Sequence, residues 1–206
     1  MPSKKNNWVY SEKVKDHFFS PRNILKIPEE KYKADGVGYT GSPKCGDVMK
    51  MFIKVKNGRI IDCKWQTFGC ASAISSTSVL SEMVTKGKGM KLEDAMKIKP
   101  QDIVKELNGL PNAKIHCSVL GDKALREAIN DYYKKSGQDK KIKKEKTTVV
   151  CTCLNITDHD IEEAVLEGKD TYKKVQQATK VGTVCGACEE KVTKLIEMYK
   201  DKHFKS

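Results

Sequence analysis

A histidine and a cysteine stand next to each other at His116-Cys117, in the run KIHCS. A turn-forming Gly-Leu-Pro-Asn stretch precedes them and an amphipathic helical pattern follows, so the sequence predicts a helix start here. The positive end of a helix, the imidazole and the ammonium of Lys114 all favour a thiolate over a thiol. A thiolate in this position can bind metal or take part in sulfur chemistry. A half-buried structural cysteine is the alternative.

Two further cysteines have similar settings. Cys45 ends a glycine-rich loop and is followed two residues later by Asp47, and Cys70 follows a glycine between a predicted strand and a predicted helix. Asp47 and His116 add an oxygen and a nitrogen donor to the thiolates of Cys45, Cys70 and Cys117. Three thiolates are fewer than a stable iron–sulfur cluster prefers, and carboxylate or imidazole ligation makes iron easier to load and remove. This set favours a place of assembly over a permanent electron carrier.

Four more cysteines form a separate constellation near the C-terminus. Cys151 and Cys153 make a Cys-x-Cys pair, and Cys185 and Cys188 make a Cys-x-x-Cys pair. The unit that contains them is small, and small units have trouble stabilising themselves by apolar burial alone, so a central metal site is physically reasonable. Four thiolates suit zinc or an iron–sulfur cluster, and the number of sulfurs does not separate the two.

Composition narrows the classes of function. The chain has 206 residues, eight cysteines and a formal net charge of +12. The polar N-terminus has no apolar leader and no apolar run reaches the roughly 20 residues of a membrane helix, so we expect a cytoplasmic protein with no membrane partner, whose grouped cysteines serve metal or redox chemistry. The lysines are spread along the chain, and no arginine cluster is interleaved with aromatics, which argues against nucleic acid and for a solvated surface or an acidic protein partner.

Two strands and several helices must position the first three cysteines. The run VMKMFIKVK alternates apolar residues with lysines, and Asn57-Gly58 predicts a type I′ hairpin turn. The returning strand, 59–68, is predicted to put Ile61, Cys63 and Trp65 on its apolar face. Cys63 is therefore expected to be a core residue and not a ligand.

Helical patterns cover most of the remaining chain. His17 is predicted to pack or cap, and the serines after Cys70 are predicted to be packing residues with no base placed to activate them. The predicted helices span 8–19, 71–84, 92–98, 100–107, 117–133, 158–167, 171–179 and 189–200.

A lysine-rich stretch divides the chain. Residues 135–148 are polar and lack a hydrophobic period, which is typical of a solvated linker. We expect one domain over 1–134 and a second over 149–206. The predicted fold class is α+β, with a small antiparallel sheet packed with helices followed by a small, mainly helical domain.

Several runs resemble known families. KCGD (44–47), TFGCASAISS (67–76) and KIHCSVL (114–120), with YSEKVKDHFFSPRN (10–23), closely resemble the IscU/NifU iron–sulfur scaffold family. CTCLNITDHDIEEAV (151–165) and GTVCGACEEKV (182–192) resemble the bacterioferritin-associated-ferredoxin type of [2Fe-2S] domain. The two in series are the NifU arrangement.

The resemblance implies a scaffold for iron–sulfur cluster assembly and not an enzyme with turnover chemistry. A cysteine desulfurase of the NifS/IscS type would deliver persulfide sulfur, and a transient [2Fe-2S] or [4Fe-4S] cluster would form on Cys45, Cys70 and Cys117. Cys117 would be the sulfur acceptor, Asp47 would keep the cluster transferable and His116 would be an auxiliary ligand. Zinc can occupy such a site when it is empty. A permanent [2Fe-2S] cluster would be held by the remaining four ligands, Cys151, Cys153, Cys185 and Cys188.

The family also implies apo iron–sulfur proteins as clients and a homodimer, and leaves open whether the clients serve nitrogen fixation or general metabolism. Two departures stand out. The third, Cys-x-x-Cys-bearing domain of many NifU proteins does not follow here, so a separate carrier is expected to complete transfer. The run at 110–114 is LPNAK, where IscU proteins present LPPVK to a chaperone. Two rival functions stay open, a [2Fe-2S] electron-transfer protein with a docking domain and a zinc-stabilised interaction protein.

Overall fold

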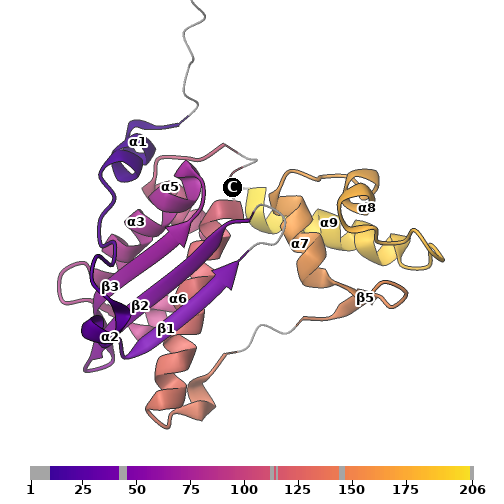
Figure 1. Ribbon diagram of the computed structural model, residues 1–206. Coiled ribbons are helices and arrows are strands. Elements are labelled where there is room, and N and C mark those ends of the chain that lie inside the picture. The colour runs from indigo at the N-terminus through magenta and orange to yellow at the C-terminus, as the bar shows by residue number, and fades with distance from the viewer. Residues whose placement is uncertain (1–9, 42–45, 112–113, 115, 144–146, 205–206) are drawn as a thin grey trace, which may run out of the picture. The chain divides into compact units, whose positions relative to one another are not determined.

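The computed structural model describes residues 10–41, 46–111, 114, 116–143 and 147–204, and of residues 116–119 it describes the backbone only. The chain forms two compact units, the first within the residues up to Ile142 and the second mainly within those after it. Figure 1 labels most of the elements of both units. Among the described residues, no helix is both long and apolar enough to cross a membrane.

The first unit is built on a four-stranded antiparallel sheet. Its strands are β1 (Gly36–Gly41), β2 (Val48–Lys56), β3 (Arg59–Phe68) and β4 (Met90–Lys91), in the order β1-β2-β3-β4. β2 and β3 form the predicted hairpin, and Asn57 and Gly58 have φ values of 53° and 70°, as a type I′ turn requires.

One sequence prediction for β3 is wrong. Ile61 was assigned to the apolar face, yet its side chain is 48% exposed, whereas Ile60 is fully buried. The pairing register shifts here, because Val55 pairs with Ile60 and Lys54 pairs with Asp62. Ile61 is therefore the extra residue of a β-bulge and turns away from the core. Cys63 is buried as predicted, and burial raises the pKa of its thiol to about 12.

Helices α3 and α6 cover one face of the sheet (Figure 1). The other face carries a smaller apolar cluster of Leu25, Tyr32 and Phe52. The helical elements of this unit are α1 (Glu12–Phe19), α2 (Glu29–Tyr32), α3 (Ala71–Thr85), α4 (Leu92–Ala95), α5 (Pro100–Glu106), α6 (His116–Lys135) and a 3₁₀ turn, η2 (Asp139–Lys141). The turn η2 lies within the predicted linker, where the sequence pattern indicated no regular structure.

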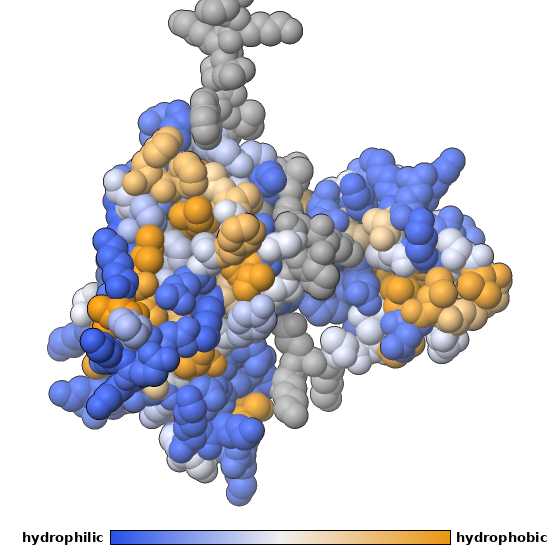
Figure 2. All heavy atoms as spheres, in the orientation of Figure 1, coloured by the Kyte–Doolittle hydropathy of each residue, from blue (hydrophilic) through white to orange (hydrophobic). Residues whose placement is uncertain are grey.

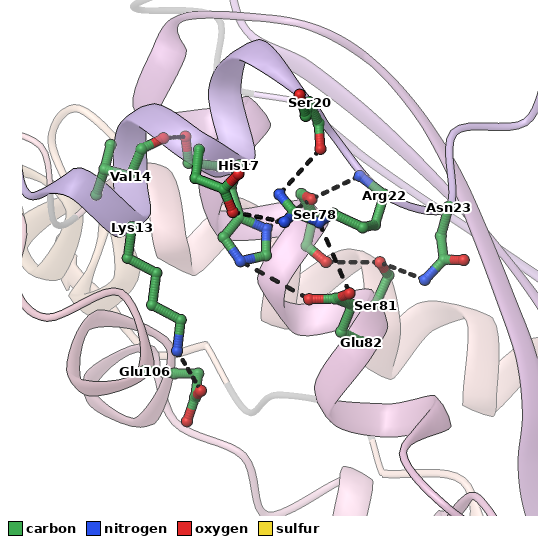
Figure 3. Close-up of polar contacts among 12 residues, drawn as sticks. Lys13, Val14, His17, Ser20, Arg22, Asn23, Ser78, Ser81, Glu82 and Glu106 are labelled. Atoms are coloured by element: carbon green, nitrogen blue, oxygen red, sulfur yellow. Dashed lines mark hydrogen bonds and ion pairs between the residues drawn. The ribbon is translucent and has the colours of Figure 1, made fainter.

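Helix α1 is anchored to α3 through buried serines. The Nδ1 atom of His17 lies 2.8 Å from Ser78 Oγ, and Ser75 Oγ donates to the Val14 carbonyl at 2.8 Å (Figure 3). His17 is buried, which confirms its predicted packing role, and burial together with the charge of Arg22 lowers its pKa. Although the His17 imidazole lies beside Ser78, the burial of these serines confirms their predicted packing role. Ser78 is fully buried and already accepts a hydrogen bond from the Arg22 amide, so the contact is structural.

The second unit packs three helices beside a two-stranded sheet. Its elements are β5 (Val149–Cys151), β6 (Ile156–Thr157), α7 (Asp158–Leu166), α8 (Tyr172–Thr179) and α9 (Glu189–Phe204). Thr157 caps α7 as predicted, in a capping box with Asp160. Near the end of α9, hydrogen bonds from His203 and Lys202 outweigh the effect of burial and lower the pKa of Glu162 to about 2. These contacts tie the last helix to α7.

Candidate metal centres

Asp47 and Cys70 meet at the open end of the β2–β3 hairpin. Val48, the first residue of β2, pairs with Phe68, the last of β3, so the residues just outside this pair are neighbours. A Cβ placed on Gly69 would lie 3.2 Å from both Cγ and Oδ2 of Asp47. The buried Asp47 carboxyl group therefore packs against the backbone immediately before Cys70.

Cys70 stands at the N-terminus of α3. Its backbone is extended, with φ −76° and ψ 171°, and its carbonyl accepts the first helical hydrogen bond from the Ile74 amide at 3.0 Å. The helix dipole at this end favours a thiolate. Cys70 is half-buried and packs against the main apolar cluster of the first unit.

The start of α6 lies at this same end of the sheet. Side chains larger than glycine at Gly36 and Gly38 of β1 would collide with the carbonyls of Ala128 and Ala124, respectively. A step of two residues forward along β1 therefore moves the contact four residues toward the N-terminus of α6. The two steps have similar lengths, because a strand rises roughly 3.3 Å per residue and a helix roughly 1.5 Å per residue. The same spacing, extended to Gly41 at the end of β1, reaches the first turn of α6. Gly41 pairs with Val48, so this turn lies at the end of the sheet where β2 begins.

The structure thus brings Asp47 and Cys70 together and directs the helix that begins at His116 and Cys117 toward them. Cys45 lies outside the described residues, as do the side chains of His116 and Cys117. Joint ligation by these five residues stays a prediction.

The four cysteines of the second unit divide into an inner and an outer pair. Cys151 ends β5 and Cys188 directly precedes α9, and both are buried in the apolar core of the unit. Cys153 lies in the turn between β5 and β6, Cys185 lies in the loop between α8 and α9, and both are exposed. The sulfurs of Cys153 and Cys185 are 3.4 Å apart.

Each pair contains one thiol favoured as a thiolate and one that is not. The backbone amide of Gly182 donates to Cys151 and lowers its pKa, whereas burial and the hydrogen bond with Cys151 raise the pKa of Cys188. The amide of Ala187 lowers the pKa of Cys185, and the hydrogen bond with Cys185 raises that of Cys153. Amides aimed at cysteine sulfurs also stabilise thiolates that bind metal.

Positive φ angles shape the loop between α8 and α9, which carries Cys185. Gly182 and Gly186 have φ values of 73° and 72°. Such angles suit glycine, and here they turn the chain so that amides at the loop point back toward the sulfurs. A Cβ at Gly182 would also collide with the Tyr172 hydroxyl group.

The donor set suits an iron–sulfur cluster. Four soft sulfur donors, a buried inner side and amide donors to sulfur are what such a cluster needs. In the described part of the chain no three His, Cys, Asp or Glu side chains are grouped around one ion position. The thiols lie as two pairs, Cys151 with Cys188 and Cys153 with Cys185, and all four would hold the cluster.

Sequence reasoning missed the apolar side chains around the outer pair. Leu154 follows Cys153 and Val184 precedes Cys185, and their side chains are 39% and 66% exposed. The sequence shows that each cysteine has an apolar neighbour. It does not show that these apolar side chains are exposed, because exposure depends on the fold.

Comparison with known proteins places both units among iron–sulfur proteins. Residues 149–198 match the BFD-like [2Fe-2S] binding domain. Residues 9–139 match the NifU-like N terminal domain, and the chain belongs to this family.

Curated relatives agree with both matches. The chain is 51% identical over 135 residues to iron-sulfur cluster assembly scaffold protein IscU 1 of Archaeoglobus fulgidus, which covers 66% of this chain and 84% of that protein. It is 46% identical over 135 residues to the iron-sulfur cluster assembly enzyme IscU of Drosophila melanogaster, covering 65% of this chain and 83% of the relative. It is 37% identical over 201 residues to the nitrogen fixation protein NifU of Nostoc, covering 94% of this chain and 65% of that protein. The chain therefore spans about two thirds of the length of this NifU.

Proposed function

We propose that this protein is a scaffold on which iron–sulfur clusters are assembled and from which they are passed to apo-proteins. The observation that carries the proposal is the contrast between its two ligand sets. Asp47, a hard oxygen donor, is buried beside Gly69, the residue before Cys70, whereas the second unit offers four thiols in two close pairs. Mixed ligation favours release and all-sulfur ligation favours retention.

Sulfur enters at Cys117 in this proposal. The Cys117 thiolate attacks the outer sulfur of a persulfide on a cysteine desulfurase, a new S–S bond forms at Cys117, and the donor's cysteine leaves as a thiolate. The helix start at Cys117 favours the attacking thiolate. The cluster built from this sulfur and added iron is cargo, held by Cys45, Cys70 and Cys117 with Asp47, and with His116 as an auxiliary ligand.

The second unit holds its cluster as a resident cofactor. Cys151, Cys153, Cys185 and Cys188 are the ligands, and the bound [2Fe-2S] group supplies one-electron redox chemistry. The amides of Gly182 and Ala187 stabilise two of the thiolates. Zinc can replace the cargo cluster in the first unit without serving the function.

The partners follow from the separate roles of the two units, assembly in the first and a resident cluster in the second. A desulfurase of the NifS/IscS type donates sulfur, and apo iron–sulfur proteins or a separate carrier accept the cluster. The protein works in a reducing cytoplasm, as a dimer and without nucleic acid or membrane, and it has no turnover chemistry of its own. Names such as nitrogen fixation protein NifU among the relatives make nitrogenase components candidate clients.

Reconstitution tests the proposal. The purified protein is mixed anaerobically with desulfurase, cysteine and ferrous iron, and then with apo-ferredoxin, and wild type is compared with Cys117→Ala. Wild type should gain visible absorbance beyond that of the resident cluster and pass it to the ferredoxin, and Cys117→Ala should do neither. Equal transfer by both proteins would contradict the assignment of Cys117. A wild type that gains nothing but is redox-active would favour the electron-transfer alternative.

A further inference from the structure

Tyr172, the first residue of α8, contacts the loop that carries Cys185. A Cβ built on Gly182 of this loop would collide with the Tyr172 hydroxyl oxygen and would lie 3.3 Å from the ring carbon that bears it. Gln176, one turn further along α8, donates to the same hydroxyl group at 3.1 Å. The Tyr172 hydroxyl group therefore occupies the space that a side chain at position 182 would fill.

Gly182 is linked through its backbone to one of the buried cysteines. Its amide donates to Cys151, and its φ is 73°. Glycine adopts φ angles of either sign about equally readily, so this residue does not fix the direction of its own amide. Contacts with other residues must fix it. Val181, the preceding residue, is fully buried, and the Tyr172 hydroxyl group packs against Gly182 itself.

Helix α8 holds Tyr172 in place. Thr171 caps the helix, because its side chain accepts a hydrogen bond from the Lys174 amide. Val175, in the first turn of α8, is fully buried in the core of the unit, and the Tyr172 ring packs against the same core. The hydroxyl group is therefore presented to the loop from a well-anchored side chain.

We propose that Tyr172 is a positioning residue for the resident cluster, and that its hydroxyl group fixes the Gly182 peptide so that the amide stays directed at the Cys151 sulfur. The proposal rests on the proposed [2Fe-2S] cluster of the second unit. An amide that donates to a ligand sulfur stabilises the reduced cluster more than the oxidised one, because the reduced cluster carries one more negative charge. Tyr172 thus acts through Gly182 on the reduction potential and on the retention of the cluster.

The cluster-loaded full chain with Tyr172→Phe tests the proposal. This change keeps the ring and removes only the hydroxyl group. We expect a reduction potential more negative than that of wild type. Loss of the cluster to an iron chelator should be roughly three- to tenfold faster, a smaller effect than that of removing a direct partner of a ligand. A residue that only packed would change thermal stability and leave the potential unchanged.

Two adjacent glutamines of α8 provide a second variant and its matched control. Gln176→Leu removes the donor to the Tyr172 hydroxyl group and should shift the potential in the same direction by a smaller amount. Figure 2 shows that the outer surface of α8 is hydrophilic, and Gln177 is exposed. Gln177→Leu should match wild type in both the potential and the rate of cluster loss.

Gly182→Ala tests the contact from the side of the loop. The new methyl group would collide with the hydroxyl oxygen, whereas in the Tyr172→Phe background its nearest neighbour would be the ring carbon at 3.3 Å. The strain of alanine at positive φ is common to both backgrounds. Gly182→Ala should therefore speed cluster loss by a larger factor in the wild-type background than in the Tyr172→Phe background. Equal factors would show that the hydroxyl group does not press on Gly182 and would overturn the proposal.

Hydrogen exchange of the same full chain, followed by mass spectrometry of peptides that span Gly182, does not depend on the colour of the cluster. Exchange should be faster in Tyr172→Phe than in wild type and unchanged in Gln177→Leu. An unchanged potential in Tyr172→Phe would overturn the proposal, and so would unchanged exchange at Gly182. A wild type whose second unit takes up no cluster would count against the proposed cofactor instead, and the exchange comparison would then decide by itself whether Tyr172 holds the Gly182 amide.

Discussion

The two cysteine regions are built from different parts of the fold. In the second unit, two of four cysteines belong to the apolar core and amides point at the sulfurs, so the site is part of what holds the unit together. In the first unit the described part of the site lies at the edge of the core, where half-buried Cys70 packs against the apolar cluster. Asp47, Cys70 and the start of α6 stand at the ends of elements that are packed elsewhere by larger apolar clusters.

This difference teaches how a protein can hold one cluster and release another. A site integrated in a core is costly to empty, because its ligands also fill space. A site at the ends of strands and helices can gain or lose iron while the sheet stays intact. Three changes at the two sites test this comparison, and a fourth, at His17, tests the packing of the first unit.

Removal of one ligand from the second unit should have the largest effect. Cys185→Ala leaves three thiols, and we expect nearly complete loss of the visible absorbance of the protein as purified. Cys45→Ala should keep that absorbance. Cys63→Ala, a change at a fully buried cysteine outside both sites, is the matched control and should keep it too. Absorption spectra of anaerobically purified proteins give the answer, and colour that survives Cys185→Ala would break the comparison.

Asp47→Ala should strengthen the hold of the first unit on its cluster. Removal of the oxygen donor leaves a softer ligand set, and we expect release to a chelator to slow by roughly tenfold. The measurement is the half-life of the newly assembled absorbance after addition of the chelator. Faster release than in wild type would show that the carboxylate retains the cluster and would reverse its proposed role.

Gly69→Ala should act in the same direction with a smaller effect. The new methyl group would lie 3.2 Å from the Asp47 carboxyl carbon and 3.1 Å from the Ala73 Cβ, so the carboxyl group must move. We expect release about two- to fivefold slower than in wild type, a fraction of a ligand's contribution. Gly41→Ala is the control, because its Cβ would meet its nearest neighbours at 3.5 Å and 3.8 Å, ordinary contact distances. Equal behaviour of the two variants would contradict the argument.

The smallest effect concerns pH. Burial and Arg22 lower the pKa of His17 in the folded state below 6.5, so the unfolded chain binds more protons in the window just below 6.5. The free energy of unfolding of the first unit should therefore decrease as the pH falls through 6.5, by at most about 1.4 kcal/mol per pH unit.

Urea unfolding followed by tryptophan fluorescence measures this effect, since Trp8 and Trp65 both precede the second unit. His17→Asn keeps a hydrogen-bond donor near Ser78 and removes the titration, so its unfolding free energy should vary less over the same pH range. An equal pH dependence in both proteins would assign the effect to other groups.

Local sequence signals predicted much of the fold. The Asn57-Gly58 turn, the capping of α7 by Thr157 and the burial of Cys63 are set by residues close in sequence, and the structure confirms them. Ile61 was assigned to the wrong face because a bulge depends on pairing with β2, which no periodicity in β3 reveals. The contact of His17 with Ser78 joins residues 61 positions apart and was equally hidden.

At the two sites, too, local features were predictable from the sequence and long-range contacts were not. Spacing alone singled out the four cysteines of the second unit, but their division into a buried and an exposed pair depends on the apolar core that encloses Cys151 and Cys188. The place of Asp47 beside Cys70 follows from the register of β2 and β3, which fixes the residues on either side of the Val48–Phe68 pair.

The most direct test challenges both clusters in one chain. After assembly with desulfurase, cysteine and ferrous iron, an iron chelator is added and the visible absorbance is followed. The account predicts two phases, a fast one that is missing in Cys45→Ala and a much slower one that belongs to the second unit. A single shared phase, or no gain of absorbance from the sulfur donor, would contradict it.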